Sequence, residues 1–356
     1  MTWAIPRHSR GEINRAGRFL AGDTHTGLSQ DQALEIINNW RSAHAFPLNT
    51  LQTGLRNKAA AVEGRYLVAQ RIKRLASIRA KLQRFPTMNL SQMQDLGGCR
   101  AVVSDINQLA ELRSSFDGGR MKHRRVNEKD YIDAPAPSGY RGLHMIYSYV
   151  SDRKRTYNGL LIEIQLRTEL QHAWATAVET VGTFLRQSLK SSQGEVAWLR
   201  FFSLMGSVIA RLEGSTRVPG TPPDDSDLVG EVRRASADLQ VEAKLRAYGR
   251  AVHEVEANVG AARYYLLDLS PSEGRVTVTG FGVGEQETAM TRYLEIEKGL
   301  TGPGSEAVLV SVESLEKLRA AYPNYFVDSD RFLETLHHVL GLPSERIELR
   351  DWIMGQ

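Results

Sequence analysis

Strict alternation of apolar and polar side chains over residues 159–167 constrains the fold of this chain more than any other feature. A strand places successive side chains on opposite faces, so the segment predicts a strand with one aliphatic face and one face carrying a carboxylate, an amide and a guanidinium. Taken alone, the pattern also fits an amphipathic edge strand whose polar face is merely solvated. The two faces carry Leu160, Ile162, Ile164 and Leu166 on one side, and Leu161, Glu163, Gln165 and Arg167 on the other.

The composition is that of a globular chain. Its 356 residues, 42% of them apolar and 24% charged, can bury one large core or two ordinary ones. The single cysteine, Cys99, excludes an internal disulfide and a cysteine-built zinc site, and a small buried side chain is expected there. No apolar run of bilayer length and no apolar leader with a cleavage site is present, so we expect a cytoplasmic protein.

Local signals predict alternating helices and strands before residue 213. Capping boxes begin helices at Ser29 and Thr168, and Pro47 is expected to end the first of them. Asn158-Gly159 is a hairpin signal that leads into the alternating strand. We expect helices over 29–44, 77–85, 168–185 and 194–213, and strands over 68–73, 98–103 and 143–150. His172 and Trp174, at the start of the helix over 168–185, are expected to support the core.

The composition changes at residue 214. Residues 214–227 contain three prolines, two glycines and three aspartates, which is typical of a linker. We therefore predict an N-terminal helical segment over 1–60, a catalytic domain over 61–213, a linker over 214–230 and a smaller C-terminal α/β domain over 231–356. In that last domain a helix is expected to reach about Val259, with strands over 264–269, 275–281 and 307–312. The predicted fold class is α+β, with a mixed sheet flanked by helices.

Basic residues are concentrated between Ala61 and Leu90, where only one acid, Glu63, is present. A second basic cluster follows at residues 120–125. Such clusters attract phosphates, although a solvated helix face has the same composition. The first cluster consists of Arg65, Arg71, Lys73, Arg74, Arg79, Lys81 and Arg84.

The spacing within the first cluster favours a site. Arg71 and Lys73 are two residues apart on a predicted strand and share a face, and Lys81 lies one helical turn after Ser77. Three cations and a hydroxyl are therefore expected to converge at the end of the strand.

Two carboxylates complete this site. Asp95 precedes a strand that could run beside the strand of Glu163. Two acids on adjacent strands, surrounded by cations, can hold Mg²⁺ between a triphosphate and an attacking hydroxyl. Phosphoryl-type transfer depends mainly on such electrostatic positioning.

Five short motifs follow one another in the chain. They are Arg71-x-Lys73 with Ser77-Ile78-x-x-Lys81, Asp95-Leu96-Gly97-Gly98-Cys99-Arg100, Lys129-Asp130-Tyr131-Ile132, Ser138-Gly139-Tyr140-Arg141-Gly142-Leu143-His144 and Glu163-Ile164-Gln165-Leu166-Arg167-Thr168. On these motifs the chain resembles the RelA/SpoT synthetase family over about residues 64–179. In that family ATP donates its β,γ-pyrophosphate to a ribose 3′-hydroxyl, and the fold is a nucleotidyltransferase-like mixed sheet.

The resemblance implies a role for each matching residue. Asp95 and Glu163 would hold Mg²⁺, and Glu163 would also serve as the base for the acceptor hydroxyl. Tyr140 would stack on the acceptor base; taken alone it also fits a core aromatic, although the preceding Ser138-Gly139 favours a loop. The remaining roles are adenine binding for Arg71 and Arg100, ATP phosphate binding for Lys73, Ser77 and Lys81, and acceptor binding for Lys129, His144, Gln165 and Arg167.

The acceptor itself stays open at this point. Many family members have a lysine and an asparagine where this chain has Ala136 and Ser138. The resemblance therefore leaves the tRNA 3′ end, GDP and GTP as alternatives.

The segment Tyr322-Pro323-Asn324-Tyr325-Phe326 resembles the Tyr-x-x-Tyr element of the fused toxin–antitoxin members called CapRel. That resemblance implies that the C-terminal domain folds over the synthetase, that Tyr322 and Tyr325 occupy the adenine pocket, and that a phage protein releases them. The alternative is a helix end that packs on its own domain.

The sequence thus favours a Mg²⁺-dependent, ATP-using pyrophosphokinase that acts on the tRNA 3′ end as an autoinhibited antiphage toxin. The alternatives are an alarmone synthetase that uses GDP or GTP, and a catalytically silent sensor of nucleotide or RNA. Retention of Asp95 and Glu163 disfavours the silent sensor, because binding alone needs no paired acids.

Overall fold

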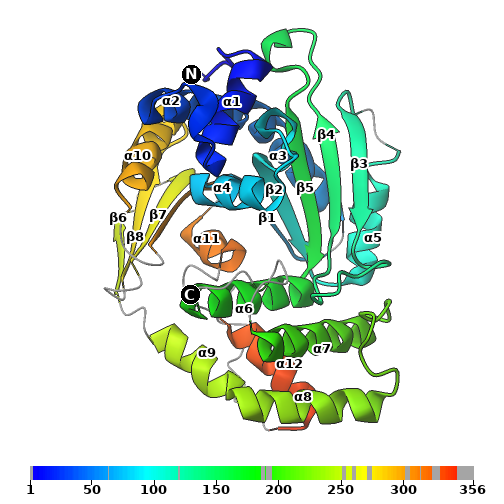
Figure 1. Ribbon diagram of the computed structural model, residues 1–356. Coiled ribbons are helices and arrows are strands. Elements are labelled where there is room, and N and C mark those ends of the chain that lie inside the picture. The colour runs from blue at the N-terminus through cyan, green and yellow to red at the C-terminus, as the bar shows by residue number, and fades with distance from the viewer. Residues whose placement is uncertain are drawn as a thin grey trace.

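A mixed β-sheet runs through the molecule and takes strands from both halves of the chain (Figure 1). The computed structural model describes residues 3–62, 64–118, 121–185, 189, 195–250, 254–258, 262–270, 275–300, 305–312, 314–322 and 329–342. Within them the sheet has nine strands in the order β3-β4-β5-β2-β1-β9-β7-β8-β6. The strands are β1 (Tyr66–Ile72), β2 (Gly97–Val103), β3 (Arg124–Asp130), β4 (Leu143–Ser148), β5 (Leu161–Thr168), β6 (Glu254–Asn258), β7 (Tyr264–Ser270), β8 (Arg275–Phe281) and β9 (Glu306–Ser311).

The central strands alternate in direction except at β2 and β5, which run parallel. The alternating segment forms β5, as predicted, and Ile162, Ile164 and Leu166 on its apolar face are fully buried. The opposite face carries Glu163 and Gln165, which are partly accessible. The predicted α+β class with a mixed sheet is confirmed.

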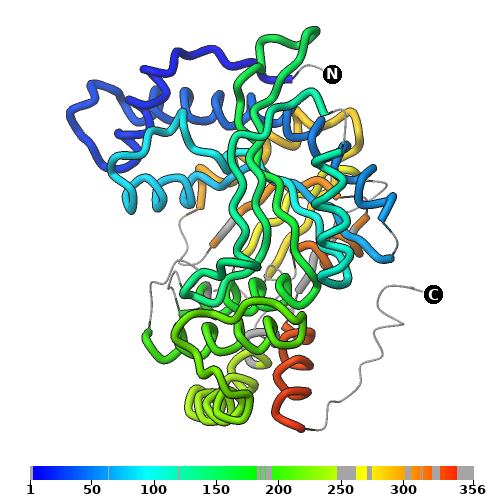
Figure 2. The backbone as a smooth tube through the Cα atoms, turned by 90° about the vertical axis from the view of Figure 1, so that its right-hand side faces the viewer, coloured from blue at the N-terminus to red at the C-terminus, as the bar shows by residue number. Residues whose placement is uncertain are grey.

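Helices cover the sheet and form a separate layer below it. α3 packs on β1 and β2, and α10 packs on β7 and β9. Figures 1 and 2 both place α6–α9 and α12 below the sheet. The helices are α1 (Arg10–Ala21), α2 (Gln30–Ala43), α3 (Ala45–Ala61), α4 (Leu75–Arg84), α5 (Ile106–Ser114), α6 (Glu169–Leu185), α7 (Val196–Leu212), α8 (Asp225–Leu239), α9 (Val241–Arg250), α10 (Gln286–Gly299), α11 (Leu315–Ala321) and α12 (Asp330–Leu340), with 3₁₀ turns η1 (Thr24–Thr26), η2 (Leu90–Gln92) and η3 (Arg155–Tyr157).

Both predicted capping boxes are present. Ser29 and Gln32 cap each other at the start of α2. At α6, Thr168 Oγ1 accepts from the Gln171 backbone at 3.2 Å, while Gln171 Oε1 accepts from the Thr168 backbone at 3.3 Å. Pro47 does not end the first helix as predicted, because it lies in the first turn of α3, where its missing N–H removes no helical hydrogen bond.

The middle of the chain differs from the sequence prediction in two places. The predicted linker ends early, because Asp224 caps α8 and the helix begins at Asp225. The predicted helix up to Val259 is divided, since Gln240 adopts the left-handed φ of 52° that ends α8. A second helix, α9, follows, and residues 254–258 form strand β6.

The C-terminal strands extend the sheet of the N-terminal half. The predicted strands appear as β7, β8 and β9. β9 pairs with β1 in antiparallel register, with Gln70 opposite Ser311 and Arg71 opposite Val310. The domain boundaries stay a prediction, but the sheet continues from one side of the predicted linker to the other.

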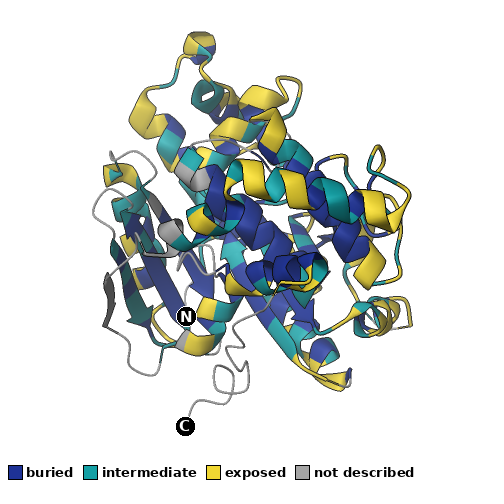
Figure 3. Ribbon diagram, turned by 90° about the horizontal axis from the view of Figure 1, so that it is seen from below, coloured by how far each residue is buried: buried dark blue, intermediate teal, exposed yellow. Residues whose placement is uncertain are grey.

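Two large apolar clusters stabilise this arrangement. One lies between the sheet and helices α1–α4, and it includes Cys99, which is 2% exposed, as expected for a small buried side chain. The other joins α6–α9 to α12 around Trp174 and Trp198. Seen from below, the helices of this layer show buried residues along their inner sides and exposed residues outside (Figure 3). Among the described helices, none is both long and apolar enough to cross a bilayer.

Candidate active site

Asp95 is held between two lysines at the end of β1. The backbone N–H of Lys73, just after the strand, donates to the carbonyl of Leu96 at 2.8 Å. This bond holds the end of β1 against residues 93–96, the Asp95 loop. The Nζ of Lys73 donates to Asp95 Oδ2 at 2.7 Å, and the Nζ of Lys81 donates to Oδ1 at 2.9 Å. Two of the three cations expected at the end of the strand, Lys73 and Lys81, therefore meet at Asp95.

Burial and the neighbouring charges act on the pKa of Asp95 in opposite directions. Burial alone would raise the pKa of Asp95, but Lys73 and Lys81 outweigh it and lower the pKa to about 2. Burial also lowers the pKa of Lys73, although Asp95 opposes that change. Asp95 is accordingly a carboxylate at neutral pH, with both oxygens bonded to ammonium groups.

Glu163 lies on the adjacent strand and faces the same region. The parallel register of β2 and β5 sets Gly98 beside Glu163, and a Cβ at Gly98 would lie 3.9 Å from Glu163 Oε2. Glu163 Oε1 is 2.8 Å from His144 Nδ1, and its Oε2 accepts from Gln165 Nε2 at 2.7 Å.

Both His144 and Asp95 change the pKa of Glu163. Burial raises this pKa, but the bond and charge of His144 lower it overall. Asp95 acts on the pKa of Glu163 in the opposite direction to His144, as a nearby like charge does. The two carboxylates therefore share one electrostatic environment, which a divalent cation would stabilise.

The surroundings of Tyr140 are those of the core-aromatic alternative. Tyr140 lies in a loop, as expected, but it is only 7% exposed and packs among core aromatics, with its ring 6.2 Å from that of Trp174. Its hydroxyl is 2.5 Å from His144 Nε2 and accepts from Arg167 Nη2 at 2.9 Å. The loop packs against α7 at Gly206, and stacking of Tyr140 on an acceptor base stays a prediction.

Those contacts also set the charge of His144. Burial opposes its protonation, but Tyr140 and Glu163 outweigh burial and raise the pKa of His144 to about 9. His144 is thus a cation at neutral pH that keeps Glu163 ionised and oriented.

Arg167 is buried on the same face of β5. It is 2% exposed, and besides Tyr140 its Nη2 donates to Gln165 Oε1 at 3.2 Å. Its guanidinium lies 5.2 Å from the centre of the Tyr140 ring. In this structure Arg167 therefore supports Tyr140 and Gln165, and its predicted contact with the acceptor stays a prediction.

Arg100 meets the C-terminal part of the chain. Its guanidinium lies 5.3 Å from the centre of the Tyr322 ring, and Tyr322 is 2% exposed. Burial raises the pKa of Tyr322 overall, although Arg100 and Arg71 both act to lower it. Tyr322 therefore lies at the two arginines that the resemblance assigns to adenine.

His172 joins the same two segments. Its Nε2 donates to the carbonyl of Ala320 at 3.0 Å, since a carbonyl can only accept, and its Nδ1 therefore accepts from Arg100 Nη1 at 3.2 Å. Burial, together with Arg100 and Arg167, lowers the pKa of His172 well below its usual value, so the ring is neutral.

The other predicted residues are placed as follows. Ser77 lies in the first turn of α4, and Arg71 lies half-buried on β1. Lys129 is exposed on β3, opposite His144 in the register with β4. Tyr325 lies outside the described residues.

The residues present fit a magnesium site completed by substrate. Among the described residues, no cluster of three or more potential ligands is found. Mg²⁺ in phosphate-transferring sites commonly binds one or two carboxylates and takes its other ligands from phosphates and water. Asp95 and Glu163 supply that number of carboxylates.

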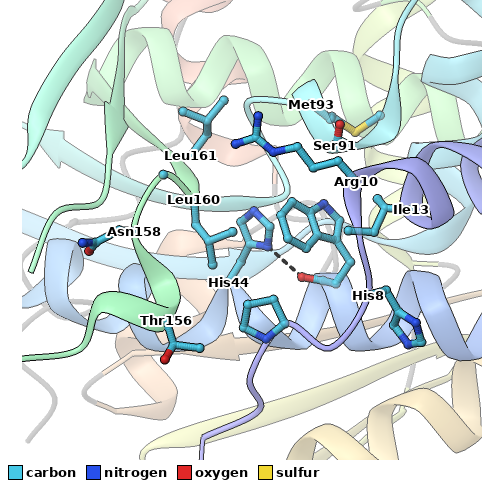
Figure 4. A pocket seen from close by; sticks show the side chains of 13 residues that line it. His8, Arg10, Ile13, His44, Ser91, Met93, Thr156, Asn158, Leu160 and Leu161 are labelled. Carbon is cyan, nitrogen blue, oxygen red and sulfur yellow. Dashed lines mark hydrogen bonds between the residues drawn. The ribbon is translucent and has the colours of Figure 1, made fainter.

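A cavity of about 160 Å³ lies next to the Asp95 loop (Figure 4). It is lined by Met93, two residues before Asp95, and by His44, whose Nδ1 donates to the carbonyl of Trp40 at 2.7 Å. The Cβ of His44 lies 3.4 Å from where a side chain at Gly97 would begin. None of the predicted site residues lines this cavity.

Sequence reasoning missed the long-range contacts of His172. The expected support of the core is provided by Trp174, whose Nε1 donates to the carbonyl of Phe202 at 2.9 Å. His172 instead contacts Arg100 and α11, 148 residues away. No local pattern could have indicated a partner at that separation.

Comparison with known proteins finds a family similar to the region that carries these residues. Residues 70–182 match the family model described as "Region found in RelA / SpoT proteins". This part of the chain is similar to the RelA/SpoT region. It contains Arg71, Asp95 and Glu163, and it ends within α6.

Two curated proteins are similar in sequence to part of this chain. The chain is 33% identical over 111 residues to GTP pyrophosphokinase YjbM of Bacillus subtilis, covering 31% of this chain and 52% of that protein. It is 31% identical over 114 residues to GTP pyrophosphokinase YwaC of the same organism, covering 30% and 52%. The chain thus spans about half the length of the curated relatives it matches.

Solved structures are less similar. Small alarmone synthetase 2 from Bacillus subtilis aligns with a TM-score of 0.42 at 24% identity, covering 49% of this chain and 93% of that one. A GTP pyrophosphokinase family protein from Streptococcus pneumoniae aligns with a TM-score of 0.42 at 20% identity, covering 60% and 98%.

Proposed function

We propose that this chain is an ATP-dependent pyrophosphokinase that transfers the β,γ-pyrophosphate of ATP to a ribose 3′-hydroxyl. The observation that carries this proposal is the position of Asp95, clamped by Lys73 and Lys81 beside the strand of Glu163. The RelA/SpoT region and the two curated relatives support it.

Lys73 and Lys81 can exchange their bonds to Asp95 for bonds to the phosphates of ATP. A bound triphosphate offers Lys73 and Lys81 stronger anionic partners, which frees the oxygens of Asp95. Asp95 and Glu163 would then hold Mg²⁺, which when bound neutralises charge on the phosphates. The cations and the acids are therefore both needed, in separate roles.

The transfer itself needs one base and one leaving group. The acceptor 3′-oxygen forms a bond to the β-phosphorus as the bond from that phosphorus to the α–β bridging oxygen breaks, and AMP leaves. Glu163 takes the hydroxyl proton, and His144 orients Glu163 through the 2.8 Å bond.

Glu163→Gln tests this assignment. We expect a loss of transfer of at least about a hundredfold, because removal of a general base commonly costs that much. Transfer is measured with ATP labelled on the γ-phosphate, and Glu287→Gln, an exposed position on α10, is the control. A Glu163→Gln variant that keeps most of the activity would remove Glu163 from the mechanism.

The same assay identifies the acceptor. The sequence predicts the tRNA 3′ end, whereas the names of the two curated relatives favour a guanosine nucleotide. Labelled ATP is therefore offered GDP, GTP and tRNA in parallel. Label transferred to tRNA alone supports the toxin hypothesis, and label transferred to GDP or GTP alone supports an alarmone synthetase.

We also propose that Tyr322 restrains ATP binding. Its ring packs against Arg100, so it occupies a position where adenine would stack. A buried cation–π contact of about 2 kcal/mol corresponds to roughly thirtyfold in affinity. Release by a phage protein, and an antiphage role, stay predictions.

Tyr322→Ala tests this restraint, and Tyr322→Phe is the matched control because it keeps the ring. The alanine variant is expected to bind an ATP analogue more tightly and to arrest growth more strongly when expressed. The phenylalanine variant, which keeps the ring and loses only the hydroxyl bond to Arg100, is expected to change much less. Equal ATP affinity in all three proteins would refute the restraint.

A further inference from the structure

A buried polar cluster joins α10 of the C-terminal half to α2 and to the start of α4. Arg41 on α2 is 1% exposed, and its Nη2 donates to the hydroxyl of Tyr293 at 2.7 Å. Its Nη1 donates to Glu297 Oε2 at 2.8 Å, and the Tyr293 hydroxyl donates to Glu297 Oε1 at 2.7 Å. Figure 1 shows α10 beside α2.

The cluster ends on the backbone that carries the phosphate-binding residues. Arg41 Nε donates to the carbonyl of Lys73 at 3.0 Å, and the Leu75 N–H donates to Glu297 Oε1 at 2.7 Å. The residue before α4, Arg74, makes no side-chain cap. Glu297, 222 residues away in the chain, therefore caps the helix that holds Ser77 and Lys81.

The buried charge of Arg41 is paired with the carboxylate of Glu297. Burial would lower the pKa of Arg41, yet Tyr293 and Glu297 outweigh it and raise the pKa. A buried ion pair is costly to break because one charge is then left without a partner. The cluster therefore favours a single arrangement of α2, α10 and the start of α4.

We propose that Glu297, with Arg41 and Tyr293, is a positioning residue for the ATP phosphates. It acts through the backbone of Lys73 and Leu75 and does not touch the substrate. This inference rests on the proposed function. It gives the C-terminal half a second role, since α10 supports the phosphate-binding residues while Tyr322 covers Arg100.

Glu297→Gln is the main test, and Tyr293→Phe is a milder variant that keeps the ring if the first fails to fold. Glu295→Gln is the matched control, because Glu295 is an exposed residue of the same helix that pairs only weakly with Arg292. Two quantities are compared in the full chain: amide hydrogen exchange over residues 73–84, and KM for ATP against kcat.

The proposal predicts a local effect. In Glu297→Gln, exchange in the first turn of α4 rises about tenfold, because a neutral amide oxygen is a weaker acceptor for the Leu75 N–H than a carboxylate. KM for ATP rises, while kcat stays within about twofold of its value in the unsubstituted chain. Tyr293→Phe moves both in the same direction by less, and Glu295→Gln moves neither.

Two results would overturn the proposal. One is equal exchange at α4 in Glu297→Gln and Glu295→Gln; the other is faster exchange with a fall in kcat and no change in KM. If the unsubstituted chain shows no transfer with any acceptor, the proposed function fails, and the exchange comparison alone then decides whether Glu297 holds α4.

Discussion

Asp95→Asn should cost both stability and transfer, and the stability loss can be worked out from the structure. The lysine clamp lowers the pKa of Asp95 from 3.8 to about 2. Each pKa unit corresponds to about 1.4 kcal/mol, so the ionised carboxylate contributes on the order of 2 to 3 kcal/mol to the free energy of unfolding. Asp95 is 19% exposed, so solvent screening reduces this value little.

The sign of the pH dependence follows from the lowered pKa. A carboxyl group whose folded pKa lies below its unfolded pKa stabilises the folded state above pH 3.8, and this contribution is lost as the pH falls through about 2. At pH 7 the whole contribution is present in the unsubstituted chain and absent from Asp95→Asn. Between about pH 4 and pH 2 the variant should lose less stability than the unsubstituted chain.

Urea unfolding followed by circular dichroism measures both quantities. Asp152→Asn is the control, because Asp152 is 79% exposed and lies 3.5 Å from an exposed lysine, so its removal should change the unfolding free energy by no more than about 0.5 kcal/mol. An Asp95→Asn variant as stable as Asp152→Asn at pH 7, with the same acid dependence as the unsubstituted chain, would refute the clamp.

Three further predictions concern other parts of the molecule. Burial lowers the pKa of His44 to about 4, so the folded state should lose about 3 kcal/mol as the pH falls from 6.5 to 4, and His44→Asn should lack this dependence in urea unfolding. In Gly206→Ala the new Cβ would lie 2.6 Å from the carbonyl oxygen of Gly139, so thermal unfolding should show a loss of about 2 kcal/mol. Lys129→Ala should leave stability unchanged, since the side chain is exposed, and should raise KM for the acceptor.

Features that depend on neighbouring residues in the chain were predictable. The alternation in β5 and the capping box at Thr168 are set by backbone geometry over a few residues, and both appear where expected. Spacing on one strand and one helix predicted that Lys73 and Lys81 lie close together, but it did not predict that both bind Asp95. The loop position of Tyr140 was predictable, but its burial was not, because packing of the loop against α7 decides its exposure.

Local periods of two and of about four residues specify the strand that carries Glu163, the helix that carries Lys81 and the types of residue at the site. Which distant residues complete that site depends on long-range packing. Glu297 caps α4 and β9 joins β1 because side-chain packing and strand pairing bring together segments more than 200 residues apart, and no local pattern encodes such contacts.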